Sequence, residues 1–160
     1  MGKVKDEIIT YLKKNKYCVL CTCSKDASRA TPVRCWNDGV TIVIYSEKYT
    51  AKFKNLKKNR QVSIAMHGSR PPLKGLQLWG EARVLSQGDP QHEQYLPAQV
   101  KKNPKIREAA GKVLDLILVK PRKIVMLDQS RKGPHYLVWE ADKRGREKER
   151  EVKTLREVSA

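Results

Sequence analysis

The order of elements predicted between residues 29 and 58 constrains the fold of this chain more than any other feature. Arg29–Trp36 and Val40–Tyr45 have the composition of strands, and Asn37-Asp38-Gly39 between them is a strong hairpin turn. Pro32 has no N–H to donate to a strand ladder, so the first strand should lie at an edge or carry a bulge. Thr50–Lys58 follows as a short helix with lysines on its outer face. The segment therefore predicts a hairpin followed by a helix with a cation at its start.

Such a helix start is suited to a phosphate group. The first backbone N–H groups of a helix lack partners within it, and lysine or arginine adds a full positive charge. Lys52 lies in the first turn, and Arg29 and Arg34 lie on the preceding strand. Strand alternation without a bulge places Arg29 and Arg34 on opposite faces, so at most one reaches the phosphate, and Arg29 is favoured. The alternative for Lys52 is one more lysine on a solvated helix.

Short strands with turn signals recur along the whole chain of 160 residues, which suits one domain. Further strands are expected at Tyr17–Cys23, Gln61–Met66, Leu73–Leu85, Leu114–Lys120, Lys123–Leu127 and His135–Glu140, and further helices at Asp6–Lys14, from Pro90 to about Lys102 and from Pro104 to about Lys112. This pattern predicts a mainly β fold, a small β-barrel with flanking helices. Residues 1–140 should form that domain, and the highly charged residues 141–160 a tail, either a surface helix or a frayed end.

The charge of the chain suggests an anionic partner. Lys and Arg number 34 against 17 Asp and Glu, a formal net charge of +17. This balance fits nucleic acid, an anionic membrane surface, a small anionic ligand or simply a solvated basic surface. A basic barrel that binds nucleic acid is the rival interpretation, but stacking on bases needs aromatic side chains, and these make up only 6%. No apolar run approaches the roughly 20 residues of a membrane span. We therefore expect a cytoplasmic protein without a membrane partner. Nucleic acid is not expected as its partner either.

The cysteines do not predict a metal site. Cys18 and Cys21 have the spacing of a zinc knuckle, but the surrounding residues predict a strand, in which they would point to opposite faces. No second such pair completes a ligand set, so reduced structural thiols are expected. The sequence also shows no Ser/His/Asp set or carboxylate pair, and catalytic residues cannot be assigned. Any catalysis should therefore depend on a cofactor.

A series of short motifs resembles the pyridoxamine-phosphate-oxidase-like family of flavin-binding split barrels. The motifs, in order, are Thr31-Pro32-Val33, Asp38-Gly39, Tyr45-Ser46, Thr50-Ala51-Lys52 with Asn55-Leu56, Val62-Ser63-Ile64 and Leu78-Trp79-Gly80-Glu81-Ala82-Arg83-Val84. The resemblance covers roughly residues 6–126. It implies a Greek-key-like, six-stranded split β-barrel that forms a homodimer and binds flavin mononucleotide (FMN) at the dimer interface.

The resemblance also implies which residues bind the cofactor. On the strand that lines the flavin, it implies contacts from Arg29, Thr31 and Val33, with Arg34 at a basic position near it. Tyr45 and Ser46 match the strand end beside the cofactor, and Thr50 and Lys52 match the helix start that holds its phosphate. Gln77 and Trp79 lie on a strand that the partner subunit can present. Trp79 could stack near the flavin ring, although tryptophan more often packs in a core or an interface.

The implied function is that of an FMN-dependent oxidoreductase acting on an unidentified small-molecule substrate or redox partner. The Arg-Leu-x-Pro signature of the true pyridoxamine-phosphate oxidases is missing, so that activity is not expected. A non-catalytic flavin-binding protein or electron carrier is the alternative, since the chemistry resides in the flavin. Some relatives bind a deazaflavin or haem, but no second motif supports a haem ligand here. His67, His92 and His135 are therefore expected to be ordinary surface residues.

Overall fold

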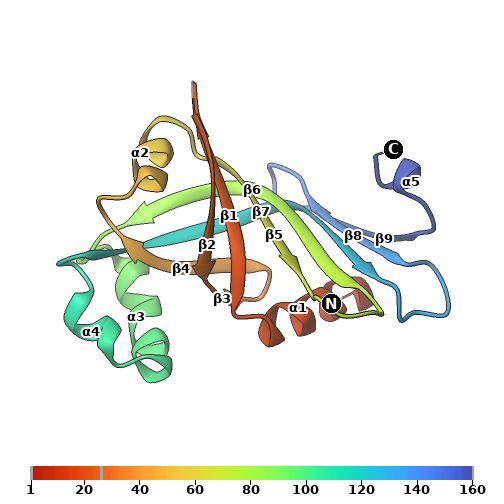
Figure 1. Cartoon of the computed structure of the whole chain (residues 1–160), viewed down its shortest axis with the longest axis horizontal. Helices are drawn as coiled ribbons and strands as arrows, with labels where there is room; N and C mark the ends of the chain where they lie inside the picture. The colour runs from red at the N-terminus through yellow and green to blue at the C-terminus, as the bar shows by residue number, and fades with distance from the viewer. Residues whose placement is uncertain (1, 26, 160) are drawn as a thin grey trace.

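The computed structural model describes residues 2–25 and 27–159. One antiparallel sheet of nine strands dominates it, in the order β2-β1-β5-β6-β7-β4-β3, with β8 paired to β7 and β9 to β8 (Figure 1). The strands are β1 (Tyr17–Ser24), β2 (Ala27–Arg34), β3 (Trp36–Asp38), β4 (Thr41–Glu47), β5 (Gln61–His67), β6 (Lys74–Leu85), β7 (Leu114–Asp128), β8 (Tyr136–Ala141) and β9 (Glu147–Val152). The helices are α1 (Lys3–Lys14), α2 (Ala51–Lys58), α3 (Pro90–Lys102), α4 (Lys105–Ala109) and α5 (Leu155–Ser159). The expected mainly β fold with flanking helices is confirmed; the sheet has nine strands, where the sequence indicated eight and the family resemblance implied a six-stranded barrel.

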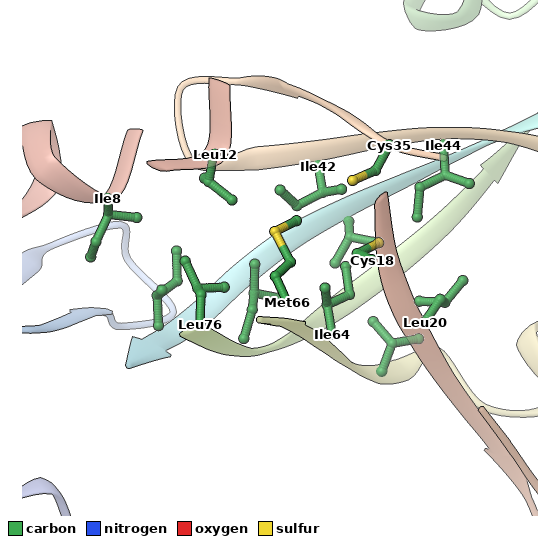
Figure 2. Packing of buried hydrophobic residues seen from close by; sticks show 14 of the residues in the cluster. Ile8, Leu12, Cys18, Leu20, Cys35, Ile42, Ile44, Ile64, Met66 and Leu76 are labelled. Carbon is green, nitrogen blue, oxygen red and sulfur yellow. The ribbon is translucent and has the colours of Figure 1, made fainter. Parts of the chain in front are cut away.

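The main core fills the inside of the curled sheet. Alternation along β1 turns Cys18, Leu20 and Thr22 inward, where all three are buried. Figure 2 shows Ile8 and Leu12 of α1 in the same cluster as side chains of β1, β4, β5 and β6. The edge strand β2 also contacts β4, so the sheet nearly closes on itself. This curvature brings β2 close to β4, and α2 packs against β1, β2 and β6.

Gly80 marks the bend of the long strand β6. The β6–β7 register shifts between Trp79 and Gly80. A Cβ atom at Gly80 would lie 2.3 Å from the carbonyl oxygen of Lys120 and 2.9 Å from the Cα of Pro121. A glycine inside a strand often marks such a close backbone approach, and only glycine fits at this position. The same irregularity admits Pro121, so the two closing strands predicted on either side of it are one continuous strand, β7.

Strand β2 is an edge strand without a bulge. Its pairing with β1 runs without interruption from Arg34 opposite Tyr17 to Ala27 opposite Ser24. Pro32 is exposed within it, and the missing N–H costs no sheet bond at an edge. Regular alternation therefore puts Arg29 and Arg34 on opposite faces.

The C-terminal residues are not a free tail. Glu147–Val152 form β9 and pair with β8, and the short helix α5 follows. Val152 and Val158 are buried against Val125 and Val138 of the sheet. The Lys5 ammonium also forms an ion pair with the Glu147 carboxylate at 2.6 Å, which ties α1 to β9. Only α5 matches the expected surface helix, and the strand before it was missed.

Candidate functional site

The helix α2 is fixed against strand β1 by buried side chains. Phe53 and Leu56 point into the main core. The side-chain amide of Asn55 donates a hydrogen bond to the Thr22 hydroxyl at 3.2 Å, and both residues are buried. Buried polar groups are stable only when paired, so this bond sets the rotation of the helix. It also determines which side of α2 each lysine occupies.

Lys52 differs from the other lysines of this helix. It is 6% exposed, whereas Lys54, Lys57 and Lys58 are exposed to solvent. Desolvation by burial lowers the pKa of Lys52, and the nearby Glu47 carboxylate acts in the opposite direction. No described residue forms a hydrogen bond or ion pair with its ammonium group. The ammonium nitrogen itself is not among the fully enclosed atoms, so it can be reached from the surface, and an anion bound there would form a charge-assisted hydrogen bond with a partly desolvated cation.

The start of α2 also presents free backbone donors. Thr50 precedes the helix, and its hydroxyl donates to the carbonyl of Glu47 at 3.0 Å instead of capping the first turn. The amides of Phe53 and Lys54 donate to the Thr50 carbonyl. Those of Ala51 and Lys52 have no acceptor in the part of the chain that the structure describes. These amides and the Lys52 ammonium make an anion-binding helix start.

The inward face of β2 runs beside this helix. Arg29, Thr31 and Val33 are paired with Thr22, Leu20 and Cys18 and therefore share their face of the sheet. Because Thr22 accepts the bond from Asn55, Arg29 is placed next to α2, which contacts β2 directly. Arg29 is exposed and Thr31 half-buried, and no described residue bonds to either side chain. The structure thus brings Arg29 and Thr31 to the side of the sheet where Lys52 lies.

Ser46 and Tyr45 diverge at the end of β4. Ser46 alternates with the buried Ile44 and lies on the inward face, shortly before Thr50. Tyr45 points to the other face and is buried beneath α3, with its ring 5.6 Å from that of His92 in an edge-to-face arrangement. Burial, with a contribution from Glu93, raises the pKa of Tyr45 to about 12. Its side chain does not join Lys52.

Three other predicted residues also lie elsewhere. Arg34 is on the opposite face of β2 from Arg29, and its guanidinium stacks over the Trp36 ring at 5.6 Å. Gln77 and Trp79 are on the outward face of β6, where Trp79 is 42% exposed. Within one chain, none of the three can meet the start of α2 through the sheet.

The outward face around Gln77 and Trp79 has small side chains. Across the paired strands they adjoin Ala65 and Ser63 of β5, which in turn pair with Val19 and Cys21 of β1. These last four residues are only partly buried. The described helices pack elsewhere: α1 and α2 at the interior, α3 and α4 over β4 and the adjoining part of β7, and α5 over β8. A flat sheet face therefore stays open beside Trp79.

Sequence reasoning missed some features and misplaced another. It gave Asn55 no role, although a polar residue between the core positions Phe53 and Leu56 was a detectable signal. His92 was expected at the surface but is completely buried, and its Nδ1 lies 3.2 Å from the Glu93 carboxylate. The described part of the chain contains no group of three or more potential metal ligands. It also contains no helix long and apolar enough to cross a membrane.

Comparison with known proteins supports the family resemblance. Residues 4–126 match the family described as pyridoxamine 5'-phosphate oxidase. No curated protein sequence matches the chain significantly.

Solved structures with the same fold are distant in sequence. A protein of Listeria innocua described as a pyridoxamine 5'-phosphate oxidase is 20% identical, with a TM-score of 0.66 over 78% of this chain and 98% of that one. A related FMN-binding protein of Nostoc punctiforme is 11% identical, with a TM-score of 0.66 over 94% of each chain. A haem-binding protein of Mycobacterium smegmatis is 13% identical, with a TM-score of 0.68 over 94% of this chain and 59% of that one. These likenesses establish a split-barrel fold.

Proposed function

Because the chain belongs to the pyridoxamine 5'-phosphate oxidase family, we propose that it binds FMN and acts through it as an oxidoreductase on a small-molecule substrate or redox partner. The observation that carries this proposal is the burial of Lys52, without an anionic partner among the described residues, at the start of α2. The phosphate of FMN would supply the missing negative charge.

The residues around the start of α2 fit a phosphate ester. The Lys52 ammonium and the free amides of Ala51 and Lys52 would bind its oxygens from the helix side. Arg29 would approach from β2 with a planar guanidinium that can donate two parallel bonds. The hydroxyls of Thr31 and Ser46 lie on inward faces near the same place and would bind polar atoms of the cofactor.

A second copy of the chain would complete the site. Gln77 and Trp79 cannot reach Lys52 of their own chain, but they lie on the open outward face of the sheet. If two chains pack through this face about a two-fold axis, each presents its Gln77 and Trp79 to the other. The partly buried Val19, Cys21 and Ala65 would then form the apolar part of the interface.

The chemistry would reside in the cofactor. FMN, when bound, accepts electrons from a donor and returns them to an acceptor. The chain would hold the phosphate, orient the ring and exclude water from one side of it. Oxidation of pyridoxamine phosphate itself is not proposed, because the sequence signature for that substrate is missing.

Haem is less compatible with this site than FMN. A haem iron needs an axial ligand such as histidine. His92 is buried beneath α3 beside Tyr45, and His67 and His135 belong to neither α2, β2 nor β4. An unpaired lysine at a helix start instead suits a phosphate. The haem-binding relative therefore shares the fold without defining the ligand.

The direct test is to purify the protein and record its absorption spectrum before and after adding FMN. We expect one FMN per chain with a flavin spectrum, which a donor bleaches anaerobically and a small acceptor or oxygen restores. A haem or deazaflavin spectrum would contradict the cofactor assignment. If FMN binds but neither accepts electrons from any donor nor passes them to any acceptor, the protein is a flavin-binding protein and not an oxidoreductase.

A further inference from the structure

A hollow at the opposite end of α2 from Lys52 collects unpaired positive charge. It has a volume of about 380 Å³ and is lined by Leu56, Lys57, Arg60, Ala82, Arg83 and Val84. Its size falls within the range of roughly 300–1,000 Å³ that is usual for ligand pockets. The three cations come from the last turn of α2, from the connection to β5 and from β6, and none of the described residues that line the hollow is acidic.

The backbone holds these cations in place. The amide of Ala82 donates to the carbonyl of Arg60 at 2.8 Å, which continues the β5–β6 ladder and places the Arg60 backbone opposite Ala82, the neighbour of Arg83 in β6. The Arg83 guanidinium donates from one terminal nitrogen, Nη1, to the Gln91 side chain at 2.7 Å, which leaves its other donors free. The cations therefore sit on a packed helix and a sheet.

Among the residues that the structure describes, no carboxylate forms an ion pair with Lys57, Arg60 or Arg83. The sequence has no Asp or Glu between Lys48 and Gly80. Glu81 follows, but its carboxylate is within 3.8 Å of Arg122 and accepts a bond from Gln61 at 3.4 Å. The end of a helix attracts lysine and so explains Lys57. It does not explain Arg60 and Arg83, which lie outside the helix and repel Lys57 and each other.

We propose that this hollow binds the phosphate group of a small phosphorylated molecule, at a second anion site distinct from the one at Lys52. Two guanidinium groups and an ammonium match an anion that carries more than one negative charge. The buried Leu56 and Ala82 and the partly exposed Val84 form an apolar floor for the adjoining part of the molecule. A nucleic acid fits less well, because no aromatic residue lines the hollow to stack on a base.

The two anion sites should be separable. Lys52 and Lys57 are five positions apart in α2, which corresponds to about 7.5 Å along the helix axis. Lys52 points inward, whereas Lys57 is exposed. The second site can therefore be tested in the protein saturated with FMN, and its failure would leave the FMN proposal standing. If the protein takes no FMN, the same titration can be done without it.

The experiment is calorimetric titration of the FMN-saturated protein with inorganic pyrophosphate and, separately, with an oligothymidine strand. We expect one pyrophosphate per chain, bound roughly tenfold or more weakly by Arg60→Gln and by Arg83→Gln. Lys58→Gln removes a charge from the same turn of α2 outside the hollow and should change the affinity little.

Two results would overturn the proposal. One is the lack of saturable pyrophosphate binding, or an equal loss in Lys58→Gln, which would reveal only a diffuse basic surface. The other is oligothymidine binding that depends on Arg60 and Arg83 while pyrophosphate does not bind. All three variants change exposed residues, and circular dichroism would verify that they fold.

Discussion

The Asn55 side chain donates a buried hydrogen bond to the Thr22 hydroxyl, 3.2 Å away across the gap between α2 and β1. This contact orients the helix so that Lys52, one turn earlier, points inward while Lys54 points to solvent. The position of the proposed phosphate ligand therefore depends on a residue that does not touch the phosphate.

Replacing Asn55 by Ala should destabilise the protein by about 1–3 kcal/mol, because Thr22 is left buried with an unpaired hydroxyl. Urea unfolding followed by circular dichroism would measure the loss, with exposed Lys54→Ala as the matched control. Equal stability of the two variants would show that the Asn55–Thr22 bond does not fix the helix.

Gly80→Ala should be among the most damaging single substitutions in the chain. The new methyl group would lie 2.3 Å from the Lys120 carbonyl oxygen, so β6 and β7 would have to separate. We expect a loss of about 1–3 kcal/mol or more in the free energy of unfolding. Gly133→Ala, where no atom lies within 4 Å, is the control. If Gly80→Ala and Gly133→Ala have the same unfolding midpoint, the tight packing at this bend is contradicted.

Stability should fall in acid partly through Glu147. The hydrogen bond from Lys5, with help from the Trp139 indole, lowers the pKa of Glu147 from its usual 4.5. The folded pKa lies below the unfolded one, so the stabilisation is complete above pH 4.5 and is lost as pH falls through the folded pKa. Between about pH 6 and pH 3, the free energy of unfolding should therefore decrease less in Lys5→Ala than in the wild type. Lys3→Ala is the control. If the free energy of unfolding depends on pH equally in Lys5→Ala and Lys3→Ala, the Lys5–Glu147 ion pair does not cause the effect.

The proposed dimer can be broken at the outward sheet face. Light scattering should give about twice the chain mass of 18.4 kDa for the wild type. Ala65→Arg places a charge beside Gln77 on that face and should yield monomers. Lys58→Glu, on α2 away from this face, should stay dimeric. A monomeric wild type with bound FMN would rule out the proposed interface.

Local sequence patterns predicted much of the fold. They failed where contacts between residues far apart in sequence determine which face or element a residue belongs to. Pro32 indicated an edge strand or a bulge, because its missing N–H is a property of the residue's own backbone, and the structure shows the edge. The family resemblance grouped Tyr45 with Ser46, but neighbouring residues of a strand point to opposite faces, and the Tyr45 ring packs against His92 of α3. Strand β9 escaped notice because its charged side chains pair with distant partners such as Lys5.

In the candidate site, too, some residues were predictable from local patterns and others only from contacts between distant parts of the chain. The motif around Lys52 singled it out from neighbouring lysines, and its burial agrees. Strand alternation favoured Arg29 over Arg34, and the unbroken β1–β2 register excludes the bulge that could have placed both on one face. The position of Asn55 between core residues could signal a buried polar group, but its partner Thr22, which is far away in sequence, was identified only in the structure.

The most direct test of the phosphate site is a fluorescence titration of Lys52→Ala and Lys54→Ala with FMN and with riboflavin. We predict that Lys52→Ala weakens FMN binding by about 1.5–3 kcal/mol, the scale of a charge-assisted hydrogen bond. Its affinity for riboflavin, which has no phosphate, should change much less, and Lys54→Ala should resemble the wild type with both ligands. If Lys52→Ala and Lys54→Ala bind FMN equally well, or if Lys52→Ala weakens FMN and riboflavin alike, Lys52 does not hold the phosphate.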